Sequence, residues 1–207
     1  MRKTLLFLAL ILSVSLTAQH DEAYVDALTA DFTTKLQSRG IDSYFVAQRY
    51  CLGTIEMFTL DDGSMCSSRG TYYENYVVWR EDDGTSMIKK IDNCGMYFSL
   101  PLPNPELYTT FETKTSQLRE ESVEPYEVAN PENNPIASTE VHPCRREYTF
   151  VEAGSSFSKS YRLYDLTNDS SQRNLNFEAN NATTIVAMDT MLDNAISSMS
   201  SQMKRQN

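Results

Sequence analysis

The hydrophobic pattern predicts a helix near each end of the chain. Apolar residues recur at spacings of three and four over residues 25–36 and again over residues 185–199, which places each set on one helix face. Asp21 stands where an N-cap is expected, and Gly40 stands where a helix commonly ends in a left-handed residue. We therefore expect two amphipathic helices that each bury one face.

Between these helices, runs rich in β-branched and aromatic residues predict strands. The runs cover residues 43–50, 54–60, 72–80, 86–91, 147–152 and 156–166, with a further short strand near 174–178. Asp83-Gly84 separates two of the runs, and Asp-Gly in this position is typical of a hairpin turn. A turn with two central residues would pair Val78 with Lys89 and Val77 with Lys90.

All seven prolines lie between Pro101 and Pro143. Because proline lacks a backbone donor, a sheet cannot run unbroken through this stretch, which we interpret as a Pro-rich inserted segment with a short helix over residues 104–118. The two flanking parts share the cysteines, so residues 19–207 are expected to form a single domain. The predicted fold class is α+β: an antiparallel sheet with an N-terminal and a C-terminal amphipathic helix packed on one face, and the Pro-rich inserted loop between two strand groups.

Residues 1–18 have the organisation of a secretory signal peptide. Arg2 and Lys3 give a positive start, a short apolar run follows, and small residues lead to Ala18. The apolar run is too short to span a bilayer, and no later run reaches the roughly 20 residues that a transmembrane helix requires. We expect cleavage before Gln19 and export to the periplasm or the extracellular medium, with no transmembrane segment in the mature chain.

The four cysteines all follow the predicted signal peptide, at Cys51, Cys66, Cys94 and Cys144. An even number in an exported chain predicts two disulfides, and three connectivities are open. The alternative is a structural zinc site, but the closely spaced ligand pairs that usually mark such a site are missing. We therefore expect disulfide bridges, and predict neither a metal site nor a cofactor.

The charge of the chain argues against nucleic acid and anionic lipid as partners. Its 28 acidic and 18 basic residues give a formal net charge of −10, which becomes −12 when Arg2 and Lys3 are removed, and phosphates repel such a surface. The sequence also lacks a nucleophile elbow, a phosphate-binding loop, and zinc-protease or calcium-loop motifs. His142 lies close to Cys144, but a cysteine in a disulfide offers no thiolate to a catalytic pair. A non-enzymatic role is therefore favoured.

Aromatic residues in the run over 72–80 are the candidate ligand contacts. Tyr72 and Tyr76 share one face of the predicted strand, and Trp79 lies on the other. Such rings beside lysines of the next strand would suit a sugar or a peptide, whereas strand propensity alone also explains them. We predict an exported, disulfide-stabilised binding or structural domain whose partner is a protein, a peptide or a glycan. The alternative is a secreted hydrolase that uses a pair of carboxylates the sequence does not identify.

Overall fold

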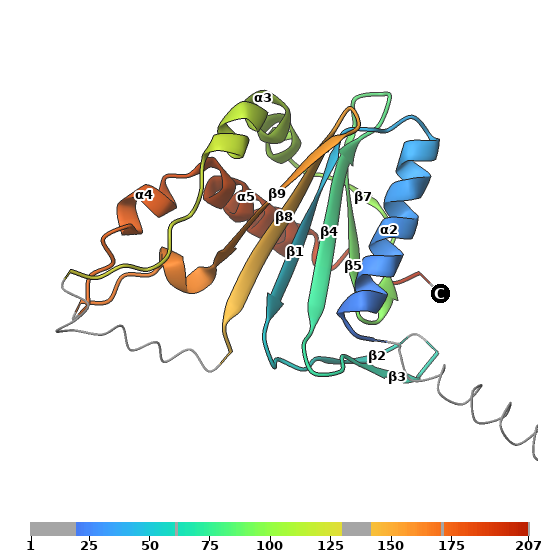
Figure 1. The fold of residues 1–207 in the computed structure, drawn as a ribbon. Helices are drawn as coiled ribbons and strands as arrows, with labels where there is room; N and C mark the ends of the chain where they lie inside the picture. Colours follow the sequence, from blue (N-terminus) through green and yellow to red (C-terminus); the bar gives the residue numbers. More distant parts are fainter. Residues whose placement is uncertain (1–19, 61, 130–141, 171, 207) are drawn as a thin grey trace, which may run out of the picture.

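The computed structural model describes residues 20–60, 62–129, 142–170 and 172–206. Its main element is an antiparallel sheet with the strand order β6-β5-β4-β1-β8-β9, in which β7 also pairs with β5 (Figure 1). The strands of this sheet are β1 (Tyr44–Cys51), β4 (Tyr73–Arg80), β5 (Ser86–Asp92), β6 (Gly95–Met96), β7 (Leu100–Pro101), β8 (Cys144–Glu152) and β9 (Ser155–Arg162). A separate hairpin consists of β2 (Met57–Thr59) and β3 (Met65–Ser67).

Helices cover both faces of the main sheet (Figure 1). They are α2 (Glu22–Ser38), α3 (Glu106–Glu120), α4 (Phe177–Asn181) and α5 (Thr184–Met199), with a 3-10 turn, η1, at Leu163–Leu166. Helix α2 packs on one core layer that includes Val77 and Trp79. Helices α3 and α5 pack on the other layer, which includes Phe45, Val78 and Tyr148. The fold is therefore a helix–sheet–helix sandwich.

The α+β class, the antiparallel sheet and both terminal helices are confirmed, but the two terminal helices lie on opposite faces rather than on one. The reason is the central strand β4, in which the adjacent residues Val77 and Val78 are both fully buried. Successive side chains of a strand point to opposite faces, so a strand that carries apolar residues at adjacent positions needs cover on both sides. In the sequence, the unbroken apolar run from Tyr76 to Trp79 already indicates a strand that is buried on both faces.

Local predictions hold in part. Asp21 caps α2 by accepting a hydrogen bond from the amide of Tyr24, and Gly40 follows α2 with a φ of +84°. The predicted helix over 104–118 corresponds to α3. The strand near 174–178 is wrong, because α4 begins there, and the end of the run over 156–166 forms η1 instead of strand.

The hairpin between β4 and β5 has a different register from the predicted one. Val78 pairs with Ile88, and Val77 pairs with Lys89. The amide of Glu81 donates to the carbonyl of Thr85, which leaves a three-residue loop with Gly84 at a φ of +88°. A three-residue loop with glycine in the left-handed region is a common hairpin, so Asp-Gly correctly marked the turn but not its length.

Two disulfides are present, and no cysteine is free. Cys51–Cys144 joins β1 to β8, and Cys66–Cys94 joins β3 to the turn between β5 and β6. The predicted signal peptide and residues 130–141 of the Pro-rich segment lie outside the described residues. Among the helices that the structure describes, none is both long enough and apolar enough to cross a bilayer.

Candidate functional site

The three predicted contact residues lie in different environments. Trp79 is 1% exposed, contacts Phe32 of α2 edge-on, and donates its indole N–H to Glu81. Tyr76 is also 1% exposed and belongs to the core layer beneath α3 and α5. Tyr72 is half-buried and lines an open groove. Of these three rings, Tyr72 alone is placed to touch a ligand without a rearrangement of the fold.

This groove, which we call the arginine groove, lies where β1 ends and where β4 and β8 begin. Its volume is about 380 Å³. The lining combines guanidinium groups, carboxylates and tyrosine rings, and includes Arg49, Tyr50, Glu56, Tyr72, Arg146 and Asp193. A ligand in this groove therefore meets hydrogen-bond donors and acceptors side by side.

The two arginines are held in place by carboxylates of α5. Asp189 accepts a hydrogen bond from Nε of Arg146 at 3.1 Å, lies 3.8 Å from Nε of Arg49, and accepts the hydroxyl of Tyr148 at 2.7 Å. Arg49 also bonds to Asp193 at the rim. Burial alone would lower the pKa of Arg49, but Asp189 and Asp193 outweigh that effect and raise it. The guanidinium groups are therefore fixed in orientation, and that of Arg49 stays charged.

Tyr72 is fixed from two sides. Its hydroxyl donates to Asp92 at 2.8 Å, and Nζ of Lys90 lies 5.6 Å from the centre of its ring. Lys90 also lies over the rings of Tyr76 and Tyr97, and it pairs with Glu74 at 2.8 Å. Burial, followed by the nearby charge of Asp92, raises the pKa of Tyr72 far above its usual value, so the hydroxyl stays protonated.

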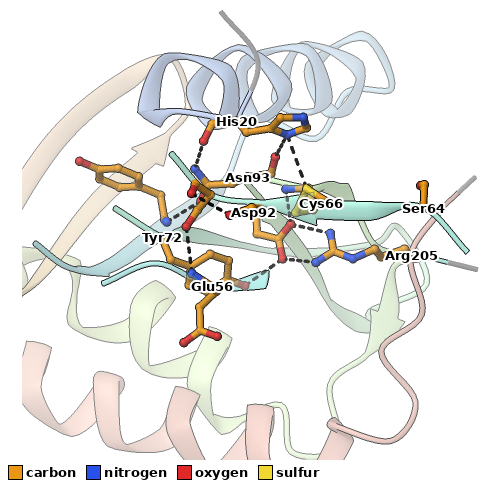
Figure 2. The surroundings of a disulfide bond; sticks show 12 residues. His20, Glu56, Ser64, Cys66, Tyr72, Asp92, Asn93 and Arg205 are labelled. Carbon is orange, nitrogen blue, oxygen red and sulfur yellow. Dashed lines mark hydrogen bonds and ion pairs between the residues drawn. A yellow bond between two sulfur atoms is a disulfide. The ribbon is translucent and has the colours of Figure 1, made fainter. Parts of the chain in front are cut away.

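Asp92 is the anchor of this end of the sheet. Its carboxylate is 0% exposed and accepts two hydrogen bonds from Arg205 at 2.5 and 2.7 Å, beside the Cys66–Cys94 disulfide (Figure 2). It also accepts from the hydroxyl of Tyr97 at 3.1 Å. A buried carboxylate with this many donors is well satisfied, so Asp92 supports Tyr72 and does not itself face the groove.

His20 approaches the same disulfide but does not form a metal site. Its Nδ1 lies 2.6 Å from the carbonyl oxygen of Asn93 and 3.6 Å from Sγ of Cys66 (Figure 2). His20, Cys66 and Cys94 place possible ligand atoms within 4.8 Å of one another. Because both sulfurs are joined in the disulfide, neither offers the thiolate that a metal requires. The imidazole instead helps to fasten the start of the described chain to the turn after β5.

The charged residues of the arginine groove were not predicted, although two features of the apolar pattern indicate them. Arg49 follows Phe45 and Ala47 at alternate positions of β1, so an arginine occurs where a core residue is expected. Asp189 lies between Ile185 and Leu192 on the apolar face of α5. A charged residue in each of two facing apolar patterns indicates a buried ion pair.

The register pairs Tyr76 with Lys90, so Tyr72, Tyr76 and Lys90 lie on one face of the sheet, where Tyr76 is buried; a ligand contact at Tyr72 stays a prediction. No protein-family model matches the chain, and neither the curated proteins nor the solved structures contain a significant match. The function must therefore be argued from the geometry of the sites alone.

Proposed function

We propose that this chain is an exported, disulfide-stabilised binding domain that holds an oligosaccharide in the arginine groove. The observation that carries the proposal is Tyr72, a half-buried ring whose position is fixed by Asp92 and Lys90 and which lines the open groove. An immobile ring binds the apolar face of a sugar at little entropic cost, and its low flexibility favours affinity.

The mixture of polar groups around Tyr72 favours a sugar over other ligands. Each sugar hydroxyl both donates and accepts hydrogen bonds, and the groove offers donors from Arg49 and Arg146 beside acceptors from Glu56. The groove is an open depression whose lining mixes charged side chains with tyrosine rings, which suits the mixed polar and apolar surface of a sugar. A hydrolase gains less support, because Glu74 pairs with Lys90 and Asp193 pairs with Arg49.

Binding of immobilised oligosaccharides, followed by calorimetry with the strongest of them, tests this proposal. Tyr72→Leu removes the ring and should weaken binding at least tenfold, whereas Tyr72→Phe keeps the ring and should weaken it less. Phe98→Leu is the matched control, because Phe98 is an aromatic residue that is 54% exposed and does not line the groove. Retention of full affinity by Tyr72→Leu, or the absence of binding to every oligosaccharide, would contradict the proposal.

Export is supported by the signal-like start of the sequence and by the two disulfides. The full chain, expressed in a bacterium with its first 18 residues intact, should be recovered outside the cytoplasm with Gln19 as its first residue. N-terminal sequencing and thiol titration measure this directly. A native protein with four reactive thiols and an intact Met1 would contradict export.

A further inference from the structure

A second groove lies on the opposite face of the same strands, between α2 and the strands β1 and β8. Helix α2 packs mainly on β4 and β5, so the α2-facing sides of β1 and β8 are left uncovered beside it (Figure 1). The groove has a volume of about 290 Å³, and its polar lining includes Asp26, Thr29, Thr33, Gln48, Asn75 and Glu147, together with the hydroxyls of Tyr44 and Thr149. We call it the acceptor groove, for the reason that follows.

The orientation of Asn75 shows an unmet acceptor in this groove. The hydroxyl of Thr29 donates to the carbonyl of Val25 at 2.8 Å, so its oxygen must accept from Nδ2 of Asn75 at 2.9 Å. The amide oxygen Oδ1 of Asn75 is left without a hydrogen-bond partner, although the residue is only 2% exposed. A buried acceptor without a partner costs free energy, and a ligand that donates to it recovers that cost.

Several of the donors around this acceptor are already used within the protein. Gln48 donates its amide to Asp26 at 3.2 Å, and Tyr50 donates its hydroxyl to Glu147 at 2.7 Å. The hydroxyl of Thr33 donates to a carbonyl of its own helix. What the groove presents is mainly oxygen acceptors, which include two carboxylates and the amide oxygens of Gln48 and Asn75, beside the hydroxyl of Tyr44. No lysine, arginine or histidine is found among the described residues that line it.

We propose that the acceptor groove binds an organic ammonium or guanidinium group, with Asp26 and Glu147 as its counter-charges and Oδ1 of Asn75 as a hydrogen-bond acceptor. Such a cation donates several hydrogen bonds and accepts none, which matches a surface that mainly accepts. A sugar fits less well, because its hydroxyls would find few donors here. The group belongs either to a free polyamine or to a lysine or arginine side chain of a peptide.

Calorimetry on the mature chain with 1,4-diaminobutane, and separately with a capped tripeptide that has a central lysine, tests the proposal and distinguishes the two sources. The double variant Asp26→Asn, Glu147→Gln keeps both shapes and removes both charges, so it should weaken binding at least tenfold. Asp31→Asn is the matched control, because Asp31 is an exposed carboxylate of α2 that pairs with Lys35 and does not line the groove. Binding should also weaken between low and high salt, and the neutral polyol sorbitol should not bind.

The site is located independently by the side-chain amide NMR signals of Asn75 and Gln48, which should shift on addition of 1,4-diaminobutane or of the peptide. Asn75→Leu should weaken binding several-fold while both carboxylates remain. Failure of both amine probes to bind, or unchanged affinity in the double variant, overturns the proposal. The arginine groove is not involved in this test, so Tyr72→Leu should leave amine binding unchanged.

Discussion

The two grooves draw on the same pair of strands but differ in how their charges are satisfied. In the arginine groove, Arg49 and Arg146 are bonded to carboxylates of α5. In the acceptor groove, Asp26 and Glu147 receive hydrogen bonds from neutral groups only, and Asn75 keeps an unpaired oxygen. The arginine groove therefore has its charges balanced by the fold itself, whereas the part of the chain that the structure describes places no cationic side chain in the lining of the acceptor groove.

This difference predicts which substitutions change the stability of the fold and which change ligand binding. Breaking a buried ion pair is strongly destabilising, because the partner that remains is left as an unpaired buried charge. An acceptor without a partner does not stabilise the fold, so its substitution is tolerated and its effect appears on ligand binding instead. Substitutions in the arginine groove should therefore lower stability, and those in the acceptor groove should leave it nearly unchanged.

The largest loss of unfolding free energy is expected from removing the disulfide that joins β1 to β8, the two strands that both grooves share. Cys51–Cys144 ties β1 to β8 across a sequence separation of 93, whereas Cys66–Cys94 spans 28. Since the longer loop restricts the unfolded chain more, replacing both cysteines of Cys51–Cys144 by alanine should cost about 4–5 kcal/mol of unfolding free energy, against about 3–4 kcal/mol for Cys66–Cys94. Urea unfolding of both double variants measures this, and a larger loss for Cys66–Cys94 would contradict the ranking.

An intermediate effect is expected from Asp189→Asn in the support of the arginine groove. The substitution keeps the shape but removes the charge that faces Arg49, Arg146 and Tyr148, so unfolding free energy should fall by about 2–3 kcal/mol. Glu112→Gln is the control, because Glu112 pairs with Arg80 at the surface and should cost less than about 1 kcal/mol. Equal losses for the two variants in urea unfolding would show that the buried network is not what stabilises this groove.

The ion pairs of the arginine groove also show which features of the structure the sequence could predict and which it could not. Periodicity identified the terminal helices and most strands, because each of these elements has a regular apolar pattern that depends on local spacing. It did not place the helices on opposite faces, and it could not bring Arg49 together with Asp189, which lies 140 positions later. Tyr72 and Tyr76 lie on one face, but Tyr76 and Trp79 are both buried, because helices cover both faces of the sheet. Contacts between residues that are far apart in the chain have little effect on the local spacing of apolar residues, so periodicity does not predict them.

Asp26→Asn in the acceptor groove should have the smallest effect on the unfolding free energy, and it should raise this free energy rather than lower it. Burial, together with Glu147, raises the pKa of Asp26, while the amides of Asn75 and Gln48 lower it; the result is a pKa above the usual value of 3.8. The folded state therefore binds the proton more tightly than the unfolded state, so stability falls as pH rises through this range.

At pH 7 the ionised Asp26 is unfavourable, and the asparagine should stabilise the fold by less than about 0.5 kcal/mol. The gain should vanish at pH 3, where Asp26 is protonated in both states. Urea unfolding at both pH values, with Asp31→Asn as the control, measures it, and a clear loss of stability at pH 7 would show that Asp26 is a structural group. With saturating 1,4-diaminobutane the order should reverse, because the bound cation stabilises the wild type and not the variant.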